Sequence, residues 1–325
     1  MSWQCRALPR LERTCLSASF AKALDAAHAA AAEQHYPQGA LYVVATPIGN
    51  LADISLRALH VLALADCVAC EDTRHTQSLL RAYGIDKTGA QLLAVHQHNE
   101  AEAAQQVIAR LAQGQRVAYV SDAGTPAISD PGARLVGAVR AARQRVMPLP
   151  GASSVTAAIS ASGAMAPGAE DGGFIFMGFL SPKAMLRQAA VQALLTEQRA
   201  VVLLEAPHRI EALAQALAVL GARQLTVARE LTKQFEEIDT LAAQDFPAWF
   251  TGQPQRQRGE FVLVLHPLAH VADDATDAAA DTRNDRVLNL LLAELPLKTA
   301  VRLAAELTDS PRNRLYARAL ALKGG

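Results

Sequence analysis

Residues 121–132 read SDAGTPAISDPG, a turn-rich stretch that separates two regular patterns. Before it stands the apolar run VAYV (117–120), typical of a buried strand, and after it ARLVGAVRAA, which has helical spacing. A glycine-bearing loop between a strand and a helix usually cradles a phosphate. This loop instead carries two carboxylates, Asp122 and Asp130, which repel phosphate. We therefore expect it to hold an adenosyl or a cationic group.

The strand–loop–helix pattern recurs on both sides of this loop. Over residues 40–153, strands and helices alternate, which predicts an α/β domain with a largely parallel sheet. A second series of strands and helices fills residues 154–268 and predicts another α/β domain with a more mixed sheet. The fold class is thus α/β, in two domains.

Three further segments flank these domains. Residues 1–39 are predicted to be an extension, either poorly ordered or a lone helix, and residues 269–282 a polar, alanine-rich linker. Residues 283–325 are predicted to form a small helical module with eight basic and four acidic residues, a net charge of 8 − 4 = +4. Its basic residues are Arg283, Arg286, Lys298, Arg302, Arg312, Arg314, Arg318 and Lys323.

Composition limits the possible partners and the compartment. The 31 basic residues balance 31 acidic ones, so no field of the whole molecule attracts nucleic acid, and any such surface must be local. Four unevenly spaced cysteines fit a reducing, cytoplasmic setting. Every apolar run is shorter than the ~20 residues of a membrane span, and the N-terminus lacks the apolar core of a secretory signal.

Two residue pairs invite a metal site, and we predict none. Cys67 and Cys70 have no second cysteine pair to complete a zinc site, and on a strand they point to opposite faces, so we interpret them as buried thiols. His96 and His98 flank a strand end without the further ligands that a metal would require. We expect both to be hydrogen-bonded loop histidines.

Seven polar loops follow predicted strands, and this concentration indicates an enzyme. Ligands of open α/β sheets bind beyond the carboxyl ends of the strands. The dinucleotide motif G-x-G-x-x-G and the P-loop motif G-x-x-x-x-G-K-[ST] do not occur after a strand. The loops read TPIGN, EDTRHT, HQHNE, SDAGTP, PGASS, EAPHR and RELTK.

Taken in order, these loops and their flanks closely resemble the ribosomal RNA small subunit methyltransferase I family of the tetrapyrrole methylase superfamily. The most specific stretches are SDAGTPAISDPG and EDTRHT, and the resemblance spans about residues 40–268. The segment ELPLKTAVRLAAELTDSPRNRLYARAL is similar to the helical tail of that family. Two departures are EAPHR, where the family often has Glu-Ser-Pro-His-Arg, and a longer, glycine-rich segment at 165–173.

The resemblance implies a fold and an activity. The implied fold has two α/β domains of the tetrapyrrole methylase type with the cofactor in the inter-domain cleft, commonly as a homodimer. The implied reaction uses S-adenosylmethionine to methylate the ribose 2′-hydroxyl of a decoding-region cytidine of 16S rRNA, cytidine 1402 in the usual rRNA numbering. The implied partner is 16S rRNA in the small ribosomal subunit.

The resemblance also implies the cofactor-binding residues. They are Pro47, Asp122, Ala123, Gly124, Thr125, Ile128, Ser153 and Ser154. Physical chemistry supports part of this set, because a carboxylate favours the cationic sulfonium and small residues let adenosine approach the backbone. For Asp130 we prefer the role of a turn residue or a helix N-cap before PGARLV over a ligand contact.

Charged residues after two strands are candidates for the acceptor side and for catalysis. They are Glu71, Asp72, Arg74, His75, Arg229, Glu230 and Lys233. Arginine and lysine suit RNA phosphates, and a carboxylate, a histidine or a lysine of depressed pKa can accept the 2′-proton. An equally favoured interpretation is an ion-pair network, such as Glu71 with Arg229, that fixes loop geometry. His208 and Arg209 suit either ligand.

Two alternative functions remain open from sequence. One is a precorrin or uroporphyrinogen methyltransferase on the same fold, which would need no RNA surface, and EDTRHT and the basic tail speak against it. The other is a non-catalytic module that binds S-adenosylmethionine or the ribosome without turnover.

Overall fold

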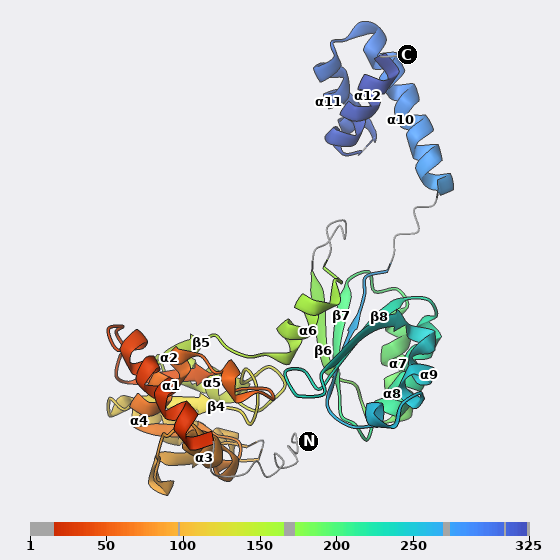
Figure 1. Ribbon diagram of the computed structural model, residues 1–325. Coiled ribbons are helices and arrows are strands. Elements are labelled where there is room, and N and C mark those ends of the chain that lie inside the picture. The colour runs from red at the N-terminus through yellow and green to blue at the C-terminus, as the bar shows by residue number, and fades with distance from the viewer. Residues whose placement is uncertain (1–15, 97, 166–172, 269–273, 309, 324–325) are drawn as a thin grey trace. The chain divides into compact units, whose positions relative to one another are not determined.

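The computed structural model describes residues 16–96, 98–165, 173–268, 274–308 and 310–323 (Figure 1). The chain divides into two compact units, Met1–Leu268 and Ala269–Gly325. The first unit contains two five-stranded sheets, and the second contains helices only among its described residues. No described helix combines the length and the apolar character that crossing a membrane demands.

The first sheet is entirely parallel, as the alternating pattern predicted, with strand order β3-β2-β4-β1-β5. Its strands are β1 (Ala40–Val44), β2 (Cys67–Cys70), β3 (Leu92–Ala94), β4 (Val117–Val120) and β5 (Arg145–Leu149). Because β4 lies between β2 and β1, the loops that follow these three strands meet at one edge. The loop SDAGTPAISDPG therefore lies in the middle of that edge.

Helices cover both faces of the first sheet (Figure 1). They are α1 (Leu16–Ala31), α2 (Leu56–Leu64), α3 (Thr73–Ala82), α4 (Glu100–Ala112) and α5 (Ala133–Ala141). The first three pack on one face and the last two on the other. Ser55 caps α2 as its sequence position predicted, since its hydroxyl accepts a 3.1 Å hydrogen bond from the amide of Ala58.

The predicted N-terminal extension is more ordered than we expected. Over its described part it forms α1, whose Ala27 and Ala31 are buried in the core beside α2. The ring of Phe20 meets Tyr83 edge-on with 5.3 Å between centroids. Small alanine side chains allow this close packing, and their helix propensity is high. Residues 16–39 therefore belong to the first α/β layer, while residues 1–15 lie outside the described part.

The two buried cysteines confirm their interpretation as inert thiols. Cys67 packs with α4 and α5, and Cys70 packs in the opposite core beside α2. Both are free cysteines, and burial raises the pKa of Cys70 to about 12. Among the described residues, no group of three His, Cys, Asp or Glu side chains is placed to bind a metal.

The second sheet is mixed, as predicted, with strand order β6-β7-β10-β8-β9. Only β6 and β7 run parallel, and the other neighbours are antiparallel. Its strands are β6 (Phe174–Phe179), β7 (Ala200–Glu205), β8 (Gln224–Arg229), β9 (Glu237–Ala242) and β10 (Phe261–Leu265). Strand β9 was not expected from the sequence, because this edge strand, EIDTLA, lacks the apolar run of a central strand.

One helix covers one face of this sheet and three cover the other (Figure 1). The single helix is α6 (Ser154–Ser162), and the three are α7 (Ala184–Leu194), α8 (Ile210–Leu217) and α9 (Phe246–Thr251). Short 3₁₀ turns occur at Leu51–Asp53, Gly89–Gln91, Ala218–Leu220, Ala243–Asp245 and Pro254–Gln257. The glycine-rich departure at 165–173 falls almost wholly on residues 166–172, which are outside the described part.

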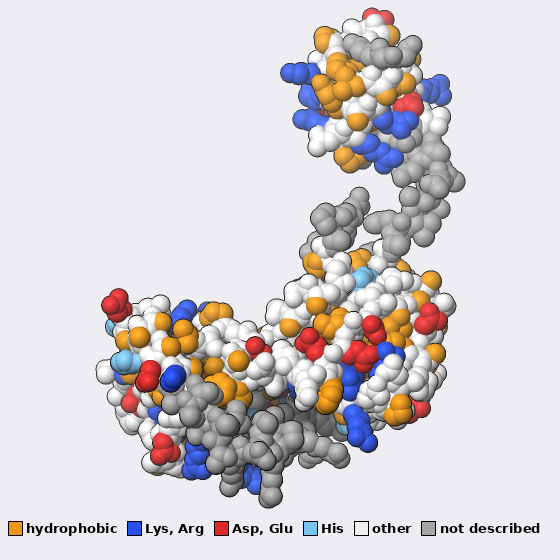
Figure 2. Space-filling view, viewed as in Figure 1, with side chains coloured by type: hydrophobic (Ala, Val, Ile, Leu, Met, Phe, Trp, Pro, Cys, Tyr) orange, Lys and Arg blue, Asp and Glu red, His pale blue; other side chains and the backbone are white. Residues whose placement is uncertain are grey.

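The C-terminal unit is a three-helix module with its own small core. Its helices are α10 (Asp274–Glu294), α11 (Leu297–Thr308) and α12 (Arg312–Lys323). Each helix contributes buried side chains to this core, for example Leu288 from α10, Val301 from α11 and Leu315 from α12. Helix α10 begins within the segment predicted as a linker, because alanine-rich sequence favours helix. Lysine and arginine side chains stand out on the surface of this unit (Figure 2).

Candidate active site

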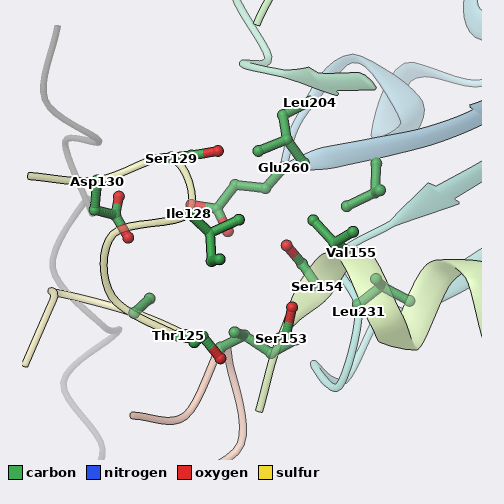
Figure 3. Close-up of a pocket in the computed structure, with 14 residues that line it drawn as sticks. Thr125, Ile128, Ser129, Asp130, Ser153, Ser154, Val155, Leu204, Leu231 and Glu260 are labelled. Carbon is green, nitrogen blue, oxygen red and sulfur yellow. The ribbon is translucent and has the colours of Figure 1, made fainter. Parts of the chain in front are cut away.

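A pocket lies at the carboxyl edge of the first sheet and is closed by residues of the second sheet (Figure 3). Six of the eight residues expected to bind the cofactor line it: Ala123, Gly124, Thr125, Ile128, Ser153 and Ser154. The second sheet contributes Leu204 and Val262, and the segments next to its strands contribute Leu231 and Glu260. Pro47 and Asp122 do not line the pocket. The pocket thus combines an apolar wall with hydroxyl and carboxylate groups.

Hydrogen bonds join three of the predicted loops around this pocket. The backbones of Thr46 and Gly124 exchange two hydrogen bonds, of 2.9 and 3.0 Å, which join TPIGN to SDAGTP. The Thr125 hydroxyl donates to the carbonyl of Ala152 over 3.0 Å, which joins SDAGTP to PGASS. Gly124 has a φ of +81°, a conformation that favours glycine. The first half of SDAGTPAISDPG is therefore held as a rigid pocket wall.

Asp130 lines the pocket and does not cap the next helix, so the preferred N-cap interpretation was wrong. Helix α5 has Gly132 at its N-cap, and the cap is supplied by Glu100 of α4. One Glu100 oxygen accepts from the amides of Gly132, Arg134 and Leu135 over 2.9, 3.0 and 3.1 Å. Because Glu100 satisfies these amides, the carboxylate of Asp130 is left to the pocket.

Three carboxylates form a group that we call the acidic cluster: Glu71, Asp122 and Asp130. Burial and the charges of Asp122 and Asp130 raise the pKa of Glu71 to about 7. Burial raises the pKa of Asp130 to about 6, with a further increase from Asp122 and an opposing hydrogen bond from Ser121. One oxygen of Glu71 is buried without a hydrogen-bond partner. Burial and mutual repulsion therefore make ionisation of Glu71 and Asp130 less favourable than in water.

The other candidates after β2 have local roles. Asp72 caps α3, because one of its oxygens accepts from the amides of Arg74 and His75 over 2.8 and 3.3 Å. The Arg74 side chain is 91% exposed and pairs with Asp72 over 3.3 Å, so it remains open to an anionic partner. A ring nitrogen of His75 lies 3.1 Å from the carbonyl oxygen of Asp122.

Arg229 is buried and fully engaged with backbone. Its guanidinium donates to the carbonyls of Arg258, Phe235 and Gln255 over 2.8, 3.1 and 2.7 Å. Its carboxylate partner is Glu237, at 3.6 Å, so the ion pair with Glu71 considered from sequence is not formed. Arg229 therefore stabilises the loops that contain Phe235, Gln255 and Arg258.

Glu230, Lys233 and Glu260 form an ion-paired group next to the pocket. The ammonium of Lys233 lies 2.8 Å from Glu230 and 3.0 Å from Glu260. Burial lowers the pKa of Lys233, but the hydrogen bonds and charges of the two carboxylates raise it overall. Lys233 is therefore not a lysine of depressed pKa. A Cβ on Gly49 would lie 2.5 Å from the Cγ of Lys233, so only glycine lets TPIGN approach this group.

The remaining candidates lie away from the described pocket lining. Arg209 pairs with the buried Glu205 over 3.1 Å and donates to the carbonyl of Leu180, while His208 is exposed. The backbone amide of His96 donates to Asn99 over 2.8 Å, in keeping with a hydrogen-bonded loop.

Sequence reasoning missed Glu260, whose carboxylate reaches toward Ile128 and Ser129 (Figure 3). It stands just before β10, far along the chain from the loop that it faces, and its local sequence RGEF has no site signature.

Comparison with known proteins defines the class first. Residues 40–246 match the model of the tetrapyrrole (corrin/porphyrin) methylases, and the chain belongs to that family. The cobalt precorrin-4 methyltransferase CbiF is similar in fold, with a TM-score of 0.50 and 18% identity over 71% of this chain and 98% of that one. The methyltransferase CobJ has a TM-score of 0.51 and 18% identity over 70% of this chain and 94% of that one.

Closer relatives identify the particular branch. The ribosomal RNA small subunit methyltransferase I of Escherichia coli O157:H7 is 45% identical over 88% of this chain and 96% of its own length. The protein of that name from Pseudomonas aeruginosa is 46% identical over 88% of this chain and 98% of its own length. Residues 277–323 match the RsmI C-terminal HTH domain. The chain is a member of the ribosomal RNA small subunit methyltransferase I family.

Proposed function

We propose that this protein transfers a methyl group from S-adenosylmethionine to the ribose 2′-hydroxyl of a decoding-region cytidine of 16S rRNA, cytidine 1402 in the usual numbering. One observation carries the proposal: similarity to small subunit rRNA methyltransferases extends over 96–98% of their length and includes the C-terminal domain. The exposed basic residues of that domain provide the local positive surface that an otherwise neutral chain requires for RNA.

The pocket fits the proposed cofactor. S-adenosylmethionine supplies an activated methyl group on a cationic sulfonium when bound. The apolar side chains of Ile48, Val155 and Leu231 suit the adenosine body, and the carboxylates of Asp130 and Glu260 suit its positive charges. Ser153 and Ser154 lie at the start of α6, where hydroxyls and backbone amides meet a polar ligand.

Glu71 is the residue that we propose to accept the 2′-proton. Its raised pKa, about 7, suits a group that must be ionised before the reaction and protonated after it. Asp130 contributes to that shift and lines the pocket, which places Glu71 within electrostatic reach of a ligand there. Alignment of the methyl donor and the hydroxyl acceptor by the loops supplies the larger part of the barrier reduction, roughly 7–11 kcal/mol in favourable cases.

Radiolabel transfer tests the proposal. The substrate is the small ribosomal subunit from a strain that lacks this modification, incubated with S-adenosylmethionine carrying a tritiated methyl group. Label is expected in 16S rRNA, on the ribose of one cytidine, because the relatives that match this chain over nearly their whole length are small subunit rRNA methyltransferases. Label on a precorrin but not on RNA would support the tetrapyrrole alternative. Cofactor binding without any transfer would support a non-catalytic module.

The C-terminal unit is proposed to bind the RNA. Among its basic residues, Arg312 and Arg314 stand exposed on α12, while Arg318 pairs with Asp285 over 2.6 Å. Removal of residues 269–325, at the boundary between the two units, is expected to weaken binding of small subunits at least tenfold and to leave the cofactor affinity unchanged. Equal losses of both affinities would assign the unit a structural role.

We also propose that the protein is a cytoplasmic homodimer, as in the family that it resembles. Sedimentation equilibrium is expected to give twice the mass of the 34.5 kDa chain. A monomer at working concentration would contradict this part of the proposal.

A further inference from the structure

Phe235 is an exposed aromatic residue that stands four positions after Leu231, a residue of the pocket lining. Its exposed fraction is 69%, the largest of any Phe, Tyr or Trp that the structure describes. It belongs to the loop between β8 and β9, in which Leu231 lines the pocket. An exposed aromatic ring offers a flat apolar face against which a partner ring can stack.

The loop that carries Phe235 is rigid. Arg229 donates to the carbonyl of Phe235 over 3.1 Å, and the amide of Glu236 donates to the carbonyl of Lys233 over 3.1 Å. The amide of Thr232 donates to the Glu236 carboxylate over 2.6 Å. Glu230 and Thr232 have φ values of +51° and +66°, strained for residues other than glycine. Because the backbone is fixed on both sides of Phe235, a partner of the ring meets a preformed platform.

The charges of this loop do not favour phosphate. Lys233 is held between Glu230 and Glu260, and Glu237 pairs with Arg229 and Arg256. Glu236 adds a further negative charge. The feature that the loop presents to a nucleic acid is therefore the flat face of an aromatic ring.

We propose that Phe235 stacks on a nucleobase of the RNA substrate, at or next to the nucleotide whose ribose is methylated. This inference rests on the proposed function. Proteins that recognise single-stranded RNA stack splayed bases on aromatic side chains, and this stacking contact does not itself use the phosphates. The loop also contributes Leu231 to the pocket lining, which is why we assign the stacked base to the neighbourhood of the methylated nucleotide.

Steady-state methylation of small ribosomal subunits by Phe235→Ala, Phe235→Tyr and Phe235→Trp tests the inference. Phe174→Ala, which removes a 42% exposed ring from β6, is the matched control. We expect Phe235→Ala to raise the KM for the subunit roughly five- to hundredfold, the range that loss of one stacked base produces. The cofactor Kd stays at the wild-type value, Tyr and Trp restore the KM, and Phe174→Ala changes it less than twofold.

Three results would overturn the inference. The first is a KM of Phe235→Ala within twofold of wild type while the wild-type enzyme labels the RNA. The second is a KM increase that accompanies dissociation of a dimer in sedimentation, because a second copy of the chain would then cover the ring. The third is wild-type protein that transfers no label to RNA, which would remove the proposed function and the inference together.

Discussion

Two charged groups flank the same pocket, and they differ in how their charges are satisfied. In the acidic cluster of Glu71, Asp122 and Asp130, the carboxylates repel one another, and one Glu71 oxygen has no hydrogen-bond partner. In the second group, which we call the paired cluster, Arg229 and Lys233 are surrounded by carbonyl and carboxylate oxygens. Buried charge without a partner destabilises a fold, so it persists where function uses it, whereas paired charge serves the scaffold.

The largest expected effect comes from the acidic cluster. Glu71→Gln removes the proposed proton acceptor while keeping the shape of the side chain, so turnover is expected to fall about 10²–10⁴-fold. The neighbouring Asp72→Asn is the control, because asparagine also caps a helix and turnover should stay within threefold. Single-turnover methylation at saturating cofactor measures both variants. Wild-type turnover in Glu71→Gln would remove this residue from the mechanism.

Substitutions in the paired cluster are expected to lower the stability of the fold and to leave turnover nearly unchanged. Arg229→Ala leaves three carbonyls without their donor and is expected to lower the free energy of unfolding by about 3 kcal/mol. Urea titration measures the loss, and Arg258→Ala, at an exposed side chain, serves as the control. Turnover per folded molecule should remain within threefold of wild type. Unchanged stability combined with lost turnover would return Arg229 to the catalytic residues that its sequence position suggested.

The two aspartates of SDAGTPAISDPG are expected to differ in their effect on cofactor binding. Asp130 lines the pocket and Asp122 does not, which reverses the division expected from sequence. Asp130→Asn is expected to weaken cofactor binding about tenfold, or about 1.4 kcal/mol, because a carboxylate facing a cation is lost. Asp122→Asn should weaken it less than threefold. Calorimetric titration with S-adenosylmethionine gives both values, and the opposite order would support the division drawn from sequence.

The smallest expected effect is on the pH dependence of the free energy of unfolding. The pKa of Glu71 is raised to about 7 in the folded chain, so the unfolded chain releases this proton at lower pH than the folded one. Rising pH between about 4.5 and 7 therefore destabilises the fold, and the penalty is complete above pH 7. Glu71→Gln is expected to be more stable than wild type by about 1 kcal/mol at pH 8, allowing for partial exposure, and nearly equal at pH 4.5. Equal unfolding curves of Glu71→Gln and wild type at pH 8 would show that ionised Glu71 does not destabilise the fold.

The fold was predictable where local signals are strong. Apolar runs such as VAYV and the capping residue Ser55 specify a strand and a helix start within a few residues. Edge strand β9 was missed because its residues EIDTLA lack an apolar run, while its pairing with β8 and the ion pair of Glu237 with Arg256, at 2.6 Å, involve other segments of the chain. Propensity in a short window contains no information about such partners.

The site was predictable in its loops and not in its long-range partners. Gly124 and Thr125 follow β4 of the first sheet, where the position after a strand favoured a ligand and the family resemblance named these residues. The role of Asp130 was misassigned because the true cap, Glu100, stands 32 residues away from Gly132. For Arg229 the sequence left a catalytic role and a loop-fixing role equally open, because the carbonyls that engage it come from Phe235, Gln255 and Arg258, which no local pattern links to it.

The pH dependence of kcat/KM in wild type and Glu71→Gln tests the central claim most directly, because this ratio reports ionisations of the free enzyme. The claim is that the acidic cluster accepts the proton. Wild-type kcat/KM is predicted to rise tenfold per pH unit below pH 7 and to level off above it, since Glu71 must be ionised to act. In Glu71→Gln the rise toward pH 7 should disappear. The same slope and midpoint in both enzymes would contradict the account.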